Sequence, residues 1–269
     1  MWNRIKSGWS LACGQPFAVF VLFAYHLIWG VMLYKLVQSV LVPLLHRYPS
    51  ELSREAVQLF WIEGQFRLMK TDVLDPLLWW ALALLLLRLL LHPLLNAGVY
   101  YSLHHTGMNA GYRFVEGIRK LSLPFLGYYI LQLALMAAPL SWLAPYLWEH
   151  VSKQASYPEL GKALLPALAV YVLYVFLIQL FFMHLQIGRT DERSLLSTVL
   201  FVLRHLPAIV AAAVIVAALT AAVTAAVMTA SFIWAGFLAL AGIQAYRLAQ
   251  MFFKLWSIGT QYALWTEKA

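Results

Sequence analysis

The stretch YRFVEGIRKLSLPFLGYYILQLALMAAPLSWLAPYL, residues 112–147, joins a short basic segment to a long apolar one at Pro124. The basic segment has apolar and charged residues at helical spacing, so a helix formed there has one apolar and one charged face. Such a helix lies flat in the membrane interface, and a proline in the first turn of the next helix costs no hydrogen bond. The pattern predicts an interfacial helix, called an elbow here, that bends into a membrane span. Its apolar face comprises Phe114, Val115, Ile118 and Leu121.

The same arrangement occurs twice more, before Pro16 and before Pro207. We interpret the elbows as parts of an internal repeat of roughly 80 to 110 residues. The alternative is that basic, glycine-containing segments are simply common in cytoplasmic loops. The apolar faces are Trp2, Ile5 and Trp9 in the first elbow, and Leu196, Val199, Leu200 and Leu203 in the last.

The composition places the chain in a membrane. Of 269 residues, 63% are hydrophobic and 11% charged, and the mean hydropathy is +0.75, whereas soluble domains carry about 25% charged residues. A helix needs about 20 apolar residues to cross the hydrocarbon core, and unpaired backbone groups exclude open strands there. We therefore predict an all-α, polytopic transmembrane bundle of six helices with interfacial elbows. The predicted spans are 16–42, 77–103, 124–147, 163–187, 207–229 and 232–255.

The net charge of +8 is distributed unevenly between the two sides of these spans. Almost all of the positive excess falls on segments that share a side with both termini, so the positive-inside rule places both termini in the cytoplasm of a bacterial inner membrane. Because this charge lies beside apolar spans, we expect membrane lipids rather than nucleic acid as partners. The predicted lipid-headgroup residues are Arg113, Arg119, Lys120, Arg247 and Lys254.

The largest polar segment on the opposite side is 47–75. Apolar residues recur in it at helical spacing, which predicts an amphipathic helix over the outer face; a plain interfacial loop is the alternative. These residues are Val57, Phe60, Trp61, Gly64 and Leu68.

Arg88 is a charge in the middle of the second span. An arginine at that depth costs about 2.5–3.5 kcal/mol, so it usually faces protein or water. His92 and Asn96 follow on the same helix face, and His26 on the first span is a candidate partner. Three interpretations are open: Arg88 joins helices through carbonyl groups, lines a ligand or lipid site, or extends toward one interface. The predicted ligand-binding residues are therefore Arg88, His92, Asn96 and His26.

Sequence motifs for catalysis are missing. The chain has no H-E-x-x-H, G-x-S-x-G or strand-associated GxGxxG motif, and no acidic residue falls in a predicted span. His26, His92 and His184 invite a haem hypothesis, but histidines in a helical bundle are more often structural, so we expect no cofactor and no metal. Asp191 and Glu192 are interpreted as a solvated pair in a cytoplasmic loop.

The stretch NAGVYYSLHHTGMNAGYRFVEGIRKLSLPFLGYYILQLAL, residues 96–135, resembles a group of bacterial six-helix membrane proteins. These are the YciC-like proteins and the membrane domain found beside glycerophosphoryl diester phosphodiesterases. The matching pieces are Ala97 with Gly98, Gly107, Phe114 and Gly117. The resemblance implies the fold and no hydrolase activity, because the phosphodiesterase domain is not present in this sequence.

Two functions are compatible with these patterns. The first is a non-catalytic membrane protein that binds lipid or another membrane protein, such as a transporter complex, as an accessory or assembly component. The alternative is a small transporter for an anionic or amphiphilic substrate, with a cavity around Arg88. A transporter requires a polar path at Arg88, whereas an accessory component is dry there.

Overall fold

The structure is a computed structural model that describes most of the chain. The predicted external helix at 47–75 lies largely outside the described residues. The described residues are 1–45, 55, 58–62, 64, 66, 74–153, 157–233 and 237–268.

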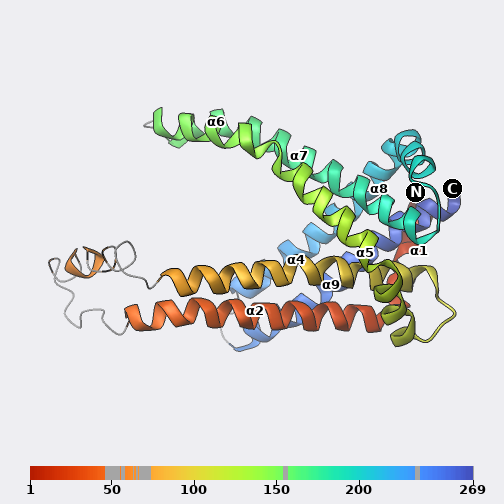
Figure 1. The fold of residues 1–269 in the computed structure, drawn as a ribbon, viewed down its shortest axis with the longest axis horizontal. Helices are drawn as coiled ribbons and strands as arrows, with labels where there is room; N and C mark the ends of the chain where they lie inside the picture. The colour runs from red at the N-terminus through yellow and green to blue at the C-terminus, as the bar shows by residue number, and fades with distance from the viewer. Residues whose placement is uncertain are drawn as a thin grey trace. The chain divides into compact units, whose positions relative to one another are not determined.

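The described residues form helices and short turns, without a strand among them (Figure 1). This confirms the all-α prediction. The helices are α1 (Trp2–Cys13), α2 (Pro16–Leu45), α4 (Leu74–His104), α5 (Ala110–Ala137), α6 (Leu140–Lys153), α7 (Tyr157–Thr190), α8 (Leu195–Ile233) and α9 (Phe237–Lys268).

Among the described residues, five helical segments are long and apolar enough to cross a membrane, which supports a multi-pass membrane protein. The predicted sixth span, 232–255, lies mostly within α9, which begins at Phe237, but its first residues end α8 and α9 is not among these segments. Gln244, Arg247 and Lys254 also make α9 more polar than the other spans. The five segments are Pro16–Ser39, Leu77–His104, Ala110–His150, Leu164–Thr190 and Leu195–Ser231.

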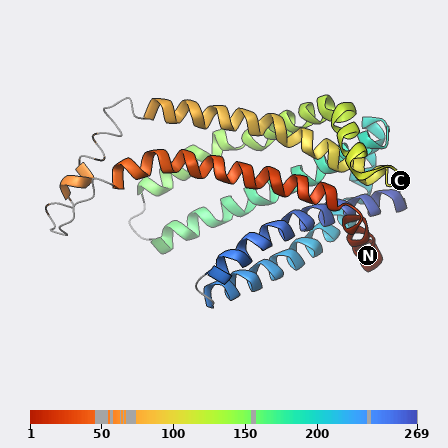
Figure 2. The ribbon, with the colours of Figure 1, turned by 90° about the horizontal axis from the view of Figure 1, so that it is seen from below.

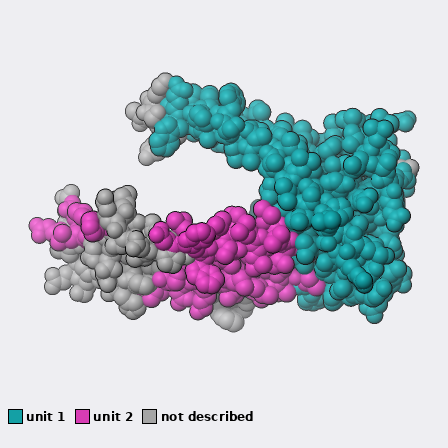
Figure 3. Space-filling model, in the orientation of Figure 1, with its two compact units in different colours: residues 1–20, 93–269 teal, residues 21–92 magenta. Residues whose placement is uncertain are grey.

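The helices divide into two compact units (Figure 3). The first unit consists of residues 1–20 and 93–269, and the second of residues 21–92. The second unit is a helical pair formed by parts of α2 and α4. The first unit holds the remaining described helices and both chain ends.

The helix break predicted before Pro16 is observed. Helix α1 ends at Cys13, and Pro16 is the first residue of α2. Between them, the Gly14 amide donates to the Ser10 carbonyl at 3.1 Å, and the Gln15 amide donates to the Ala12 carbonyl at 3.0 Å. Helix-capping hydrogen bonds therefore hold this turn. Proline can begin the next helix because the backbone N–H that it lacks would have no partner in the first turn.

The helix breaks predicted at Pro124 and Pro207 are wrong. Pro124 lies inside α5 and Pro207 inside α8, so each basic segment and its span form one helix. A proline in a helix interior removes one hydrogen bond and bends the helix, but tertiary packing can hold the helix together through it. In Figure 1 the olive start of α5 accordingly runs in a different direction from its green remainder. The predicted span 124–147 is instead interrupted between Ala137 and Leu140, where α5 gives way to α6.

Helix α1 packs closely on α9. Ile5, Gly8 and Ala12 are buried on one face of α1, and the Trp256 indole donates to the Ile5 carbonyl at 3.0 Å. A Cβ atom at Gly8 would lie 2.5 Å from the Thr260 backbone nitrogen. Only glycine permits backbones to approach this closely, which makes Gly8 the contact that sets the distance between the two helices.

The chain ends are joined beyond this crossing. The Arg4 guanidinium donates two hydrogen bonds to the Glu267 carboxylate, at 2.5 and 2.8 Å. The hydrogen bond to Arg4 holds the pKa of Glu267 below its usual range, and the same bond raises the pKa of Arg4. Both groups therefore stay charged at neutral pH, and α1 and the end of α9 share one end of this unit.

Helix α9 runs antiparallel to α8 along much of its length (Figure 2). Tyr246 contacts Thr224, the Gln261 amide donates to the Ile209 carbonyl at 3.1 Å, and the Trp265 ring packs on Phe201 with centroids 4.5 Å apart. Residue numbers thus fall along α8 as they rise along α9.

Helix α9 also runs parallel to the second half of α4. Lys254 donates to Asn96 at 3.1 Å, and Tyr262 bonds His104 at 2.9 Å. The two residues of each pair are 158 positions apart in the sequence, so the register between the two helices is constant over these turns. Helix α9 therefore runs parallel to α4 and antiparallel to α8.

We expect Gly8→Ala to loosen α1 from α9, because the added methyl group overlaps the Thr260 backbone. Overpacking of this kind costs about 1–3 kcal/mol, so amide hydrogen exchange in α1 should accelerate about tenfold. Gly127→Ala is the matched control, since nothing lies within 4 Å of a Cβ at that position. Equal α1 exchange in both variants, measured by mass spectrometry in detergent, would contradict the close crossing.

Candidate functional site

Arg113 is the most buried charged side chain of the described residues, at 4% exposure. Asn109 caps the start of α5 by accepting from the Gly111 amide, which places Arg113 in the first turn. The guanidinium donates to three acceptors at 3.0 Å: the Thr106 carbonyl, the Gly14 carbonyl and the Gln15 side-chain oxygen. Arg113 is thus directed into the protein, where its Nε has no acceptor among the described residues, and its contact with lipid headgroups stays a prediction.

Gln15 extends this network to α4. Its amide nitrogen donates to the Ser102 carbonyl at 2.8 Å, and the Ser102 hydroxyl donates back to the Gln15 oxygen at 2.6 Å. Both side chains are almost fully buried. Arg113, Gln15 and Ser102 thus join the α1–α2 turn to the end of α4 and the start of α5.

Arg113→Leu should destabilise the protein by about 2 kcal/mol, because it removes a charged donor from three acceptors. Arg113→Lys should recover part of this loss, since an ammonium supplies charge but not the planar fork of donors. The exposed Arg119→Leu is the control and should change stability by less than about 0.5 kcal/mol. Unfolding by sodium dodecyl sulfate in mixed micelles measures all three, and similar losses for Arg113→Leu and Arg119→Leu would refute this role.

A polar pocket of about 660 Å³ opens beside this network, where α4 and α7 end. It contains residues from α4, α5 and the α7–α8 corner, all within the first compact unit. Three of these elements are candidate spans, so the pocket lies at the depth where a span ends. Its walls are Tyr101, His104, His105, Lys120, Leu121, Arg189, Thr190, Asp191 and Glu192.

Asp191 is bound from several sides rather than solvated as predicted. Arg193 donates to one oxygen of its carboxylate at 2.9 Å, and the Trp265 indole donates to the same oxygen at 3.2 Å. His104 Nδ1 lies 3.9 Å from the other carboxylate oxygen. Asp191 is half-buried by these neighbours, and its charge is balanced by Arg193, whose guanidinium also lies 5.4 Å above the Trp265 ring.

Tyr262 orients the ring of His104. Burial and the Asp191 charge raise the pKa of Tyr262, so the phenol stays protonated at neutral pH. Its hydroxyl lies 2.9 Å from His104 Nδ1 and can donate to that atom, in which case Nε2 carries the proton of the neutral ring. His104 would then present a donor on its other side.

Lys120 stands at the rim of the pocket over an aromatic platform. Its ammonium is 5.6 Å from the Tyr101 ring centroid, 3.4 Å from the Tyr101 hydroxyl and 3.3 Å from Glu116. The His105 ring stacks on the Tyr101 ring, with centroids 4.0 Å apart. The lysine is thus guided toward the pocket while most of its side chain stays exposed.

The α7–α8 corner carries the remaining charges of the pocket. Helix α7 ends in a Schellman motif: the Arg193 amide donates to the Gly188 carbonyl at 3.0 Å, and the Glu192 amide donates to the Arg189 carbonyl at 3.3 Å. Glu192 occupies the left-handed position of this motif, with φ 55°, where glycine is usual. This geometry brings Arg189, Asp191 and Glu192 to the same wall.

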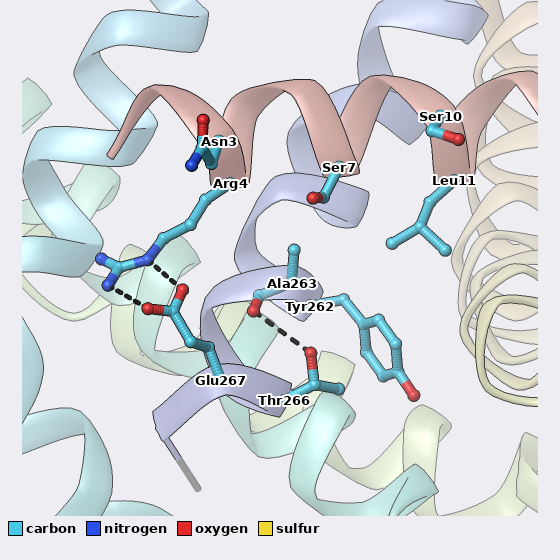
Figure 4. Close-up of a pocket in the computed structure, with 9 residues that line it drawn as sticks. All are labelled: Asn3, Arg4, Ser7, Ser10, Leu11, Tyr262, Ala263, Thr266 and Glu267. Carbon is cyan, nitrogen blue, oxygen red and sulfur yellow. Dashed lines mark hydrogen bonds and ion pairs between the residues drawn. The ribbon is translucent and has the colours of Figure 1, made fainter.

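A second, more open pocket of about 540 Å³ lies between α1 and α9 (Figure 4). Its two charged residues, Arg4 and Glu267, neutralise each other. The Thr266 hydroxyl donates to the Ala263 carbonyl at 3.1 Å. An ionic ligand would have to compete with these internal bonds, so the pocket beside Lys120 is the better candidate site.

The structure describes some neighbours of each predicted ligand-binding residue. Within the second unit, the exposed Arg88 guanidinium lies 5.6 Å over the Trp29 ring, and the His26 ring lies 5.3 Å from that of Tyr25. His92 is half-buried, and Asn96 accepts from Lys254 in the first unit. The walls of the two pockets described above include none of Arg88, His92, Asn96 and His26.

The predicted headgroup residues differ in their surroundings. Arg119 and Arg247 are exposed, which suits such a role without testing it. Lys120 lines the polar pocket. Lys254 is directed inward to Asn96 instead of outward to an interface.

Sequence reasoning missed His104, His105, Tyr262 and the bound state of Asp191. The available signal was the pair of histidines at the end of one span together with the charged corner RTDER, residues 189–193, at the end of another. In the described part of the chain, no group of three or more His, Cys, Asp or Glu side chains is arranged to hold a metal ion. Comparison with protein-family models, curated proteins and solved structures finds no match, so the six-helix family resemblance stays a prediction.

Proposed function

We propose that this chain is a six-span protein of a bacterial inner membrane with both termini in the cytoplasm. The Arg4–Glu267 ion pair supports an even number of crossings, because it joins the two chain ends on one side. Five segments are candidate spans, and α9 is the element that can supply a sixth. It accompanies α8 in the opposite direction and α4 in the same direction, so it crosses with them. The positive-inside rule assigns the shared side to the cytoplasm.

Cys13 provides a direct test of this topology, because it is the single cysteine of the chain and is exposed. A membrane-impermeant maleimide should label Cys13 in inverted vesicles but not in intact spheroplasts. In a Cys13→Ser background, Thr266→Cys should behave in the same way and Glu159→Cys in the opposite way. Labelling of Cys13 and Thr266→Cys from different sides would overturn the six-span topology.

We further propose that the protein is a non-catalytic accessory component that binds a phospholipid headgroup in the pocket beside Lys120. The observation that carries this proposal is the position of two cations, Lys120 and Arg189, in a polar pocket where candidate spans end. Lipid phosphates occupy the same depth of a bilayer. Leu123 and Leu196 are strongly exposed on the neighbouring α5 and α8 surfaces, which suits contact with acyl chains.

Neutralising both pocket cations should weaken phospholipid binding about tenfold or more, because charge-assisted hydrogen bonds contribute about 1.5–3 kcal/mol each. We would titrate the purified protein in detergent with short-chain phosphatidylglycerol and phosphatidylethanolamine and count bound lipids by native mass spectrometry. The double variant Lys120→Ala with Arg189→Ala is compared with the wild type.

The matched control is Lys6→Ala with Arg204→Ala, which removes two exposed cations that lie outside the pocket walls and outside the set of predicted headgroup residues. Its affinity for both lipids should stay close to that of the wild type. Equal losses in the two double variants, or no loss in either, would show that the pocket is not the lipid site.

A further inference from the structure

We infer that the pocket selects a zwitterionic headgroup in which a phosphate is followed by a primary ammonium, as in phosphatidylethanolamine. This inference rests on the proposed lipid-binding function and names the class of lipid. It follows from the presence of both charge signs in one wall. Lys120 and Arg189 line the pocket together with Asp191 and Glu192.

The four charges are not equally available to a ligand. Asp191 already accepts from Arg193 and Trp265, so its charge is balanced within the protein. The Lys120 ammonium already interacts with the Tyr101 hydroxyl and the Glu116 carboxylate. Arg189 and Glu192 are both exposed, and neither side chain is held by a hydrogen bond or ion pair seen among the described residues, although Arg189 lies near enough to Tyr128 to act on it electrostatically. These two residues form the uncommitted pair of opposite charges.

Arg189 and Glu192 have complementary roles toward such a headgroup. The guanidinium suits the phosphate, with Lys120 as a second cation at the rim. The carboxylate suits an ammonium with N–H donors. A purely anionic headgroup such as phosphatidylglycerol would satisfy Arg189 but leave the Glu192 carboxylate beside a negative phosphate with no ammonium to balance it, which is unfavourable.

The backbone at Glu192 supports a role for its carboxylate. Its φ of 55° lies in the left-handed region, which is unfavourable for a residue with a Cβ. The Schellman bonds of Glu192 and Arg193 would form equally with glycine at this position. The side chain therefore contributes nothing to the helix end that glycine would not, while it adds a carboxylate to the pocket wall.

Two substitutions separate charge from backbone strain. Glu192→Gln removes the charge and keeps the strained backbone, whereas Glu192→Gly removes both. Glu159→Gln is the control, because Glu159 is an exposed acid at the other end of α7. The thermal stability of Glu192→Gly should rise, which would exclude misfolding as the cause of any lost selectivity.

The experiment measures binding of phosphatidylethanolamine, phosphatidylcholine and phosphatidylglycerol by native mass spectrometry. The wild type and Glu159→Gln should favour phosphatidylethanolamine about fivefold over phosphatidylglycerol. Phosphatidylcholine should bind more weakly than phosphatidylethanolamine, because its quaternary ammonium has no N–H donor. Both Glu192 variants should bind phosphatidylethanolamine and phosphatidylglycerol equally.

The outcomes distinguish this inference from the proposed function. Equal binding of all three lipids by the wild type, with loss of all three in the Lys120→Ala, Arg189→Ala variant, would overturn the selectivity and leave headgroup binding intact. Lipid binding that ignores Lys120 and Arg189 would overturn both. Soluble glycerophosphoethanolamine is the competitor: displacement of the lipid at equal concentration would assign the same headgroup chemistry to a soluble ligand and overturn the lipid source.

Discussion

The organisation of the first unit depends on how the buried charge of Arg113 is satisfied. A guanidinium inside a protein keeps its charge, so it requires fixed acceptors in place of water. The acceptors of Arg113 are two carbonyls and an amide oxygen, which belong to the α1–α2 turn and to the turn after α4. Because these acceptors come from segments far apart in sequence, the charge holds three helix ends at one place. Gly117 adds to this constraint, since a Cβ there would lie 2.5 Å from Tyr101 Cβ on α4.

The candidate site follows from the same gathering of helix ends. His104 comes from the last residue of α4, Lys120 from α5 and Arg189 from the last turn of α7. Helix α9 contributes Tyr262 and Trp265, which bond His104 and Asp191. A span must end where the hydrocarbon ends, so polar residues that close several spans are brought to one depth. The pocket can therefore hold charges that the apolar interior would exclude.

Much of the helical architecture could be predicted from periodicity and length. The spans predicted at 77–103, 163–187 and 207–229 fall within α4, α7 and α8. The helix breaks at Pro124 and Pro207 were wrong because proline removes one bond from a helix that packing supports on other turns. The burial of Arg113 was missed for a related reason: a helical wheel separates two faces but does not show which face meets protein.

The sequence by itself determined that this chain is helical, that it is apolar enough for a membrane, and where most of its long helices lie. These properties are local, because they depend on hydropathy and on spacing within one helix. Tertiary structure alone decided that Arg4 meets Glu267, that Arg113 is buried, and that Asp191 joins His104 and Trp265 at one pocket. Each of these contacts joins residues distant in sequence, and their pairing depends on the packing of whole helices, which no local pattern encodes.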